Sequence, residues 1–232
     1  MSGVGKVTGF LSRLTRKAPP PARAAVAGPE RVEADPAPEP VVSTKALRKF
    51  VGALRQCPSP TLLDLGPVLG PNIQYFGEQL GCKVIVEDVF ESLDRFEEEG
   101  RPSDLPAFLE TRFPQPAESV DGILCWNLFD FLDRPSADVV AAHVMRLLKP
   151  NGVLFGMFAT DRGAEARFTK FVVVDDDAFR HREYSRPRAR RAAMQNRDIG
   201  HLFGELRVSD LFLLQTRVRE VLFRKPGYRL NK

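Results

Sequence analysis

The chain has 232 residues, 43% of them hydrophobic and 28% charged, with a formal net charge of +4. This composition is typical of a soluble globular protein, and the length allows one ordinary domain with a tail. No apolar run approaches the roughly 18 residues that a membrane-spanning helix needs, and none follows the basic N-terminus. Neither a membrane span nor a secretory signal is therefore expected.

Residues 1–42 are predicted to form a disordered tail. Residues 18–42 are rich in Pro and Ala and contain no aromatic side chain, so they bury too little apolar surface to fold. Before them, basic residues accompany apolar residues at helical spacing. These favour either a short amphipathic helix that touches anionic lipid or a partner protein, or a frayed tail. The apolar residues are Val7, Phe10, Leu11 and Leu14.

The predicted domain spans residues 43–232 and begins with a helix at 45–54. An apolar strand at 61–66 follows, and then a helix at 71–80 that Gly81 ends. A second apolar strand is predicted at 83–88. Ile73, Phe76 and Leu80 are expected on the buried face of the 71–80 helix, and residues 91–99 are expected to form a solvated acidic helix.

The second half continues the alternation after a region without a clear strand. Residues 100–118 contain four prolines, so a strand there is weak or absent. A buried strand is predicted at 120–126, a helix at 136–148, a turn at 149–152 and another buried strand at 153–158. A strand at 171–175 and a short helix from Asn196 follow. The last two strands, 206–214 and 218–224, are expected to pair antiparallel.

This pattern predicts the fold class. Near-continuous apolar strands that alternate with helices are typical of a parallel sheet covered on both faces. We therefore expect an α/β, Rossmann-like, doubly wound and mostly parallel sheet with a C-terminal antiparallel hairpin. The strand, glycine turn, helix and strand of residues 61–88 are how such a fold holds a nucleotide. The dinucleotide and phosphate-loop fingerprints are rejected, because the spacing of Gly66 and Gly70 fits neither.

An arginine-rich stretch lies in a predicted insertion at about 165–195. Six arginines fall within residues 180–191, with Glu183 as the only acidic residue and Tyr184 as the only aromatic one. One interpretation is recruitment of an anionic acceptor such as RNA, a phosphorylated metabolite or a carrier protein. The other is a solvated loop that the upstream acids at 175–177 partly neutralise. A single aromatic is few for a nucleic-acid stacking platform.

Set in this order, the elements of residues 45–225 resemble the class I S-adenosylmethionine-dependent methyltransferases. Five motifs carry the resemblance, and none is specific alone. They are Asp64-Leu-Gly66-Pro-Val-Leu-Gly70, Asp88 at the second strand tip, Ser119-Val-Asp121, Leu148-Lys-Pro150-Asn-Gly152 and the hairpin 206–224.

The resemblance implies S-adenosylmethionine as cofactor and an unknown methyl acceptor. Asp64 would meet the cofactor's amino end, the glycine loop would approach the cofactor closely, and Asp88 would take the ribose hydroxyls, with Glu87 as the alternative. Asn127 and Asp130 follow the fourth strand, where the family places residues that face the methyl group; they are equally consistent with a helix start. The implied cofactor-binding residues are Asp64, Gly66, Gly70, Asp88 and Asn127.

The sequence names no catalytic residue and no metal site. Three histidines and three cysteines are scattered, without a CxxC pair, which favours reduced thiols and a cytoplasmic protein. His143 lies within the predicted helix at 136–148 and is expected to be a boundary histidine rather than a catalyst. His181 and His201 lie nearer the substrate side, where either would serve as a general base for a hydroxyl or amine acceptor. The cysteines are Cys57, Cys82 and Cys125.

Three functional hypotheses remain open at this point. The first is an active methyltransferase. The second is an inactive methyltransferase-fold scaffold, which Pro67 and Val68 motivate because they replace a donor and a small residue in the glycine loop. In this second view the Val68 side chain crowds the cofactor's methionine end. The third is an anion or nucleic-acid binder that uses the arginines at 180–191.

Overall fold

The computed structural model describes residues 39–160, 167–187, 193–214 and 216–228. Most of the tail predicted for residues 1–42, including the apolar residues at helical spacing, lies outside this part. The described chain forms two sheets. We call them the large sheet, with six strands, and the small sheet, with three.

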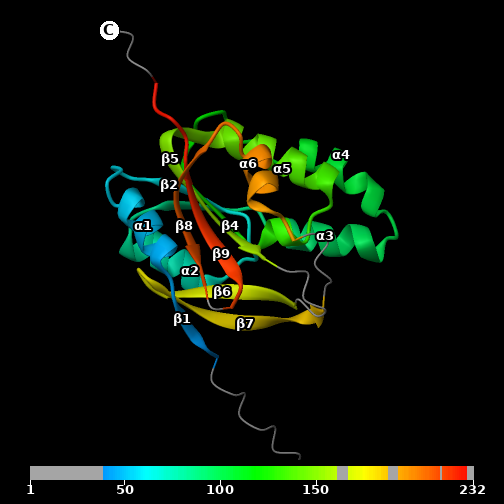
Figure 1. The fold of residues 1–232 in the computed structure, drawn as a ribbon, viewed down its shortest axis with the longest axis horizontal. Coiled ribbons are helices and arrows are strands. Elements are labelled where there is room, and N and C mark those ends of the chain that lie inside the picture. Colours follow the sequence, from blue (N-terminus) through cyan, green and yellow to red (C-terminus); the bar gives the residue numbers. More distant parts are fainter. Residues whose placement is uncertain (1–38, 161–166, 188–192, 215, 229–232) are drawn as a thin grey trace, which may run out of the picture. The chain divides into compact units, whose positions relative to one another are not determined.

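The large sheet has the order β3-β2-β4-β5-β9-β8 (Figure 1). Its first four strands in this order run parallel, whereas β9 is antiparallel to both β5 and β8. This arrangement confirms the predicted Rossmann-like α/β fold and the C-terminal hairpin. The strands are β2 (Thr61–Asp64), β3 (Lys83–Val86), β4 (Val120–Trp126), β5 (Leu148–Ala159), β8 (Arg207–Leu213) and β9 (Val218–Arg224).

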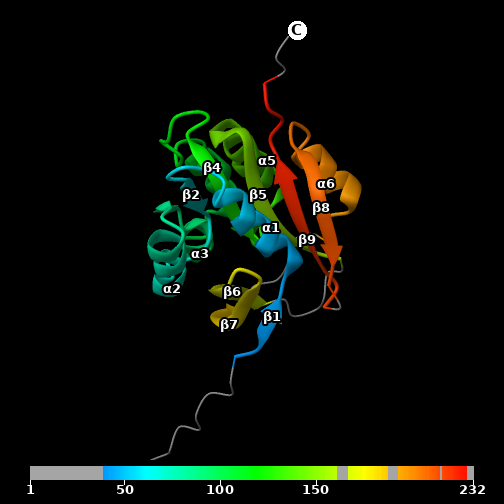
Figure 2. The same cartoon turned by 90° about the vertical axis from the view of Figure 1, so that its left-hand side faces the viewer.

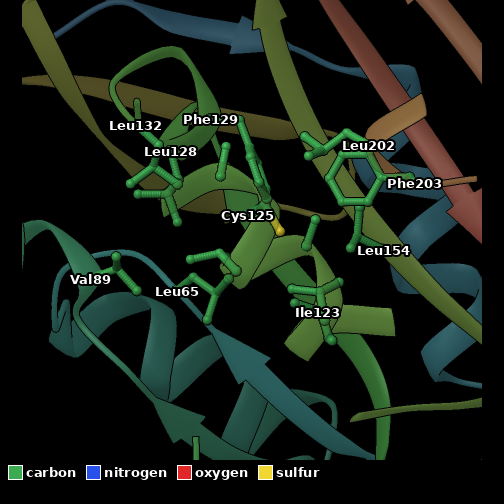
Figure 3. Close-up of a cluster of buried hydrophobic side chains, with 14 of the residues drawn as sticks. Leu65, Val89, Ile123, Cys125, Leu128, Phe129, Leu132, Leu154, Leu202 and Phe203 are labelled. Carbon is green, nitrogen blue, oxygen red and sulfur yellow. The ribbon is translucent and has the colours of Figure 1, made fainter. Parts of the chain in front are cut away.

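Helices cover both faces of the large sheet because its central strands are apolar on both sides. Leu63 and Ile123 point to the face covered by α3, α4, α5 and α6, and their neighbours Leu62 and Leu124 point to the opposite face. Figure 3 shows the first of these two cores, in which Ile123 and Cys125 of β4 lie in one cluster with Leu154 of β5 and with Phe203. The helices are α3 (Val89–Glu98), α4 (Leu105–Glu110), α5 (Arg134–Leu147) and α6 (Asn196–Leu202).

The second face is covered by α1 (Lys45–Leu54) and by α2 (Gly70–Gln74), which continues into a π-helical turn at Tyr75–Gln79. Helix α1 has the predicted bounds and buries Leu47, Phe50, Val51 and Leu54. The predicted inward face of the 71–80 helix is wrong at Ile73, which is 39% exposed. Asn72 and Tyr75 are buried instead, because they bind the small sheet.

Two further expectations concern the segment after β3. The helix predicted at 91–99 as solvated is α3, and that prediction is wrong: α3 buries Val89, Phe90, Leu93 and Phe96. Apolar residues that precede the predicted start supply half of this face. Between α3 and β4 the chain forms a short 3-10 helix (Pro102–Asp104) and α4, so residues 100–118 add no strand and β3 is an edge strand.

The small sheet has the order β1-β7-β6 and is antiparallel throughout. Figure 2 shows it below the large sheet, at the end where the parallel strands finish. Its apolar side chains Phe171, Val173 and Phe179 belong to the same core as α1 and the π-helical turn. The strands are β1 (Val41–Ser43), β6 (Arg167–Asp175) and β7 (Ala178–Pro187).

Polar contacts hold the small sheet to α1 and α2. The buried Asn72 amide donates to the Phe171 carbonyl at 2.9 Å and accepts from the Val173 amide at 2.8 Å. In the β6–β7 turn, Asp176 accepts from the Tyr75 hydroxyl and pairs with Arg55. Because the turn and the strand backbone are both bound, the small sheet is part of this domain rather than a loose extension.

None of the helices in the described part of the chain is both long and apolar enough to cross a membrane.

Asn72→Ala should destabilise the domain by about 2 to 4 kcal/mol, because it leaves two buried backbone groups of β6 without partners. Urea unfolding followed by circular dichroism would measure this loss. Gln74→Ala, at an exposed position of the same helix, is the matched control and should change stability by less than about 0.5 kcal/mol. Equal stabilities of the two variants would contradict the role given to Asn72.

Candidate cofactor site

The candidate site lies where the order of the parallel strands reverses. From β2 the chain passes to β3 on one side of β2, and it then returns to β4 on the other side. In open α/β sheets, ligands bind outside the carboxyl ends of the strands at such a switch point. Asp64 ends β2 and Trp126 ends β4, so both lie at this point.

The Asp64 carboxylate is buried, with 3% of the residue exposed. Its Oδ1 accepts a hydrogen bond from the Gly66 amide at 2.9 Å and one from the Trp126 indole Nε1 at 2.7 Å. Burial disfavours the charged form and raises the pKa of Asp64 to about 6, although both hydrogen bonds oppose this shift. The charge of Asp88 raises this pKa further.

Trp126 lies against the first glycine of the loop. A Cβ atom built on Gly66 would be 2.7 Å from Cδ1 of the Trp126 indole, so any other residue at 66 would collide with it. The indole stacks on Phe171 of the small sheet, with ring centroids 5.4 Å apart and an interplanar angle of 14°. It also meets the edges of Phe155 and Phe179. The backbone of Trp126 has φ +48°, a left-handed conformation that is rare for a large side chain.

Val68 and Gly70, further along the glycine loop, have open surroundings. Val68 is 63% exposed, so the side chain that occupies the space beside Gly66 is that of Trp126 rather than Val68. Gly70 opens α2, and a Cβ atom there would have nothing within 4 Å. Trp126 is not among the predicted site residues, because nothing in the sequence distinguishes it from the core aromatic residues that commonly end a buried strand.

The two acids after β3 have different partners. The Asp88 carboxylate caps α3 by accepting from the Glu91 amide at 2.9 Å, and burial raises the pKa of Asp88. Glu87 accepts from the Gln115 amide at 2.9 Å and pairs with Arg112 at 3.3 Å. In the described part of the chain, the Asp88 carboxylate is therefore hydrogen-bonded to a backbone amide, whereas the Glu87 carboxylate contacts two other side chains.

Asn127 and Asp130 both follow β4, but they differ in their hydrogen-bond partners. Asn127 is buried, and its Oδ1 has no hydrogen-bond partner among the described residues. Such an atom is costly to bury unless a ligand or water reaches it. Both Asp130 carboxylate oxygens accept from the Ala159 amide, at 3.2 and 3.1 Å, which ties the loop after β4 to the end of β5.

The histidines are not drawn together. His143 of α5 packs on Phe113, as expected for a histidine at the boundary between core and surface, and burial lowers its pKa. His181 stacks on Phe179 in the small sheet, and burial lowers its pKa as well. His201 is exposed on α6. No group of three or more His, Cys, Asp or Glu side chains among the described residues could hold a metal ion.

The arginine-rich stretch is partly described, as strand β7. Arg180 and Arg182 pair with Glu39, at 4.0 and 2.6 Å. The acids of the β6–β7 turn bind elsewhere: Asp176 pairs with Arg55 and Asp177 with Arg48, both from α1 and its end. Glu39, rather than Asp176 or Asp177, is therefore the acid that pairs with Arg180 and Arg182. Arg188, Arg190 and Arg191 lie outside the described residues.

A cleft of about 500 Å³ opens at the same end of the large sheet, beside the ends of β5, β9 and β8, which lie two to four strands from the strand of Asp64. Its floor is apolar, from Leu211 and Leu213 of β8, and its rim is polar. Arg219 lines it and is held by the carbonyl of Ala159 at 2.9 Å and by Asn196 at 2.5 Å. The remaining lining residues are Thr160, Gln195 and Arg197.

Comparison with known families supplies the assignment. Residues 63–156, which include Asp64, Gly66, Asp88, Trp126 and Asn127, match the sequence model of a methyltransferase domain. This match covers 94 of the 232 residues, so the middle of the chain is similar to the methyltransferase domain family. S-adenosylmethionine is the cofactor that this similarity implies. No curated protein sequence matches the chain.

Solved structures with a similar fold include three methyltransferases. One is a 1,6-didemethyltoxoflavin-N1-methyltransferase from Burkholderia thailandensis, with 15% identity over 79% of this chain and 80% of that one, and a TM-score of 0.47. A methyltransferase from Clostridium acetobutylicum has 14% identity over 80% and 93%, with a TM-score of 0.47. A putative type 11 methyltransferase from Sulfolobus solfataricus has 13% identity over 79% and 94%, with a TM-score of 0.42.

The donor and acceptor groups at the switch point suit this cofactor only in part. The acids Asp64 and Asp88 and the unpartnered Oδ1 of Asn127 can accept hydrogen bonds from an ammonium group and from hydroxyls. The space beside Gly66, however, is filled by the Trp126 indole. With the indole in this position, the residues do not fit a ligand placed against Gly66.

The raised pKa of Asp64 predicts a pH dependence of stability. A carboxyl with a higher pKa in the folded state stabilises the fold at low pH, and this contribution is lost as pH rises from about 4 to 6. The stability of the wild type minus that of Asp64→Asn should therefore fall by about 2 to 3 kcal/mol between pH 4 and pH 7. Urea unfolding of both proteins across this range would measure the difference. Glu205→Gln, at an exposed site, is the control for loss of one negative charge; a flat difference for Asp64→Asn would contradict the prediction.

Proposed function

We propose that the domain transfers a methyl group from S-adenosylmethionine to a small acceptor. The observation that carries this proposal is that Asp64, Asp88 and Asn127 lie at or just after the carboxyl ends of β2, β3 and β4, around the switch point of the sheet, and that no described residue bonds to the buried Asn127 Oδ1. In methyl transfer the sulfonium of the cofactor supplies the reactivity, and the protein contributes position and electrostatics. The absence of a catalytic His or Cys cluster among the described residues is compatible with this chemistry.

Each of the proposed cofactor residues has a separate task. Asp64 accepts from the cofactor's ammonium group, and Asp88 accepts from the ribose hydroxyls at the edge of the sheet. Gly66 and Gly70 allow the loop backbone to approach the cofactor, and Asn127 offers its unpartnered Oδ1 to the part of the cofactor beside β4. The supporting facts are the burial of Asp64 and Asn127 and the position of all five residues at the carboxyl ends of β2, β3 and β4.

We place the acceptor in the cleft of about 500 Å³ beside Thr160. Its volume lies in the range that small-molecule sites use, and it opens at the end of the sheet where the proposed cofactor site lies. The apolar lining from Leu211 and Leu213 suits an apolar body. The Arg197 guanidinium, which is 82% exposed although it pairs with Asp198 at 3.9 Å, suits an anionic group. These features favour a small anionic acceptor over RNA, for which the described residues of β7 offer two arginines already paired with Glu39. The three free cysteines support a cytoplasmic location.

Asp88→Ser tests the ribose contact without removing the helix cap, because Ser also caps helices well. S-Adenosylhomocysteine should bind this variant at least about tenfold more weakly than the wild type, since hydrogen bonds to a charged carboxylate are lost. Isothermal titration calorimetry would measure both dissociation constants. Glu87→Gln is the matched comparison at the neighbouring acid.

The pair of variants also locates the contact. Weaker binding by Glu87→Gln, with Asp88→Ser unchanged, would move the ribose contact to Glu87. No binding at millimolar ligand by any of the proteins, including the Trp126 variants described below, would remove the proposed function and leave an inactive methyltransferase-fold binding module as the better interpretation.

A further inference from the structure

The Trp126 indole makes, within the protein, the contacts that the proposed cofactor would need. Its Nε1–H donates to Oδ1 of Asp64, the carboxylate that would receive the cofactor's ammonium group. Its ring carbon Cδ1 lies where a substituent on Gly66 would be, the space that the family's cofactor approaches. One side chain thus takes both the polar partner and the room beside the loop.

The surroundings hold the indole in this place. It is 3% exposed, stacked on Phe171 and bordered by the edges of Phe155 and Phe179. The left-handed backbone at Trp126 is a conformation that persists in a large residue only when its neighbours enforce it. The stacking partner belongs to the small sheet, whose turn is fixed to α1 and α2 through Asp176 and whose strand β6 is fixed through Asn72.

We propose that Trp126 controls access to the cofactor site, with its indole and the methionine end of S-adenosylmethionine competing for Asp64 and for the space beside Gly66. This inference rests on the proposed function. Cofactor binding requires the indole to leave Gly66, and because the indole is stacked on Phe171, this displacement breaks its contact with the small sheet. Affinity for the cofactor is thereby set partly by how firmly the small sheet holds the indole.

This competition predicts how substitutions around the indole should change the affinity for the cofactor. A ligand that binds a state populated only in part has its apparent affinity reduced by that fraction. In the structure the indole is hydrogen-bonded to Asp64, and we call this arrangement the closed state. Substitutions that weaken this state should raise affinity, although they remove contacts from the folded protein. A residue with a purely structural role would have the opposite effect or none.

Fluorescence offers a direct test, because Trp126 is the only tryptophan in the chain. In the free wild-type protein, the buried indole should emit at short wavelength and be quenched little by acrylamide. Titration with S-adenosylhomocysteine should shift the emission to longer wavelength and increase acrylamide quenching. The titration midpoint should equal the dissociation constant from calorimetry. Binding by calorimetry without a change in emission or quenching would overturn the proposal.

Variants give a second, independent test. Trp126→Ala should bind S-adenosylhomocysteine at least tenfold more tightly than the wild type, because it removes the competitor. Trp126→Phe keeps a ring in the core but loses the N–H donor, so it should fold and show a smaller gain. Phe203→Leu, in the core on the other face of the sheet, is the control for destabilisation and should leave the affinity unchanged.

The outcomes separate this inference from the proposed function. Equal affinity of the wild type and both Trp126 variants would overturn the access role while the proposed function stands. Binding by the Trp126 variants alone would support both. If no protein binds S-adenosylhomocysteine at millimolar concentration, the proposed function fails and the competition fails with it.

Discussion

The hydrogen bonds accepted by the buried Asp64 carboxylate organise the functional end of this domain. They join the ends of β2 and β4, the two strands between which an α/β sheet binds its ligand. A buried carboxylate needs such donors, because an unpaired charge in the interior is very costly. The donors it has are the Gly66 amide and the Trp126 indole. The absence of a side chain at 66 and the strained backbone at 126 both follow from this arrangement.

The small sheet extends this arrangement beyond the large sheet. Its Phe171 ring stacks on the indole that Asp64 holds, and its backbone is bound by Asn72 from the helix that follows the glycine loop. The loop, the strand end and the small sheet are therefore mechanically linked. A ligand that displaces the indole acts on all three, which makes cofactor affinity a property of the whole end of the domain rather than of the loop alone.

The proposed cofactor site and the proposed acceptor cleft lie at the same end of the large sheet. The acids after β2 and β3 lie beside the switch point, whereas the cleft beside Thr160 lies at the ends of β5, β9 and β8, two to four strands from β2. Asp130 and Arg219 connect these regions through Ala159. The Ala159 amide donates a hydrogen bond to the Asp130 carboxylate, and the Ala159 carbonyl accepts one from the Arg219 guanidinium. Asn127 stands between them, buried and with its Oδ1 unpartnered by any described residue.

The sequence by itself determined the parallel sheet, the order of its elements and the C-terminal hairpin. Apolar strands such as 120–126 and the turn residues between them carry that information locally. It also placed Asp64, Asp88 and Asn127 at strand ends, because each directly follows an apolar run. Tertiary structure alone decided which face of the 71–80 helix is buried and what lies beside Gly66. Both depend on the small sheet, whose contacting residues lie about a hundred residues after Asn72 and 45 residues after Trp126, and contacts at such distances leave no periodic pattern around Ile73 or Trp126.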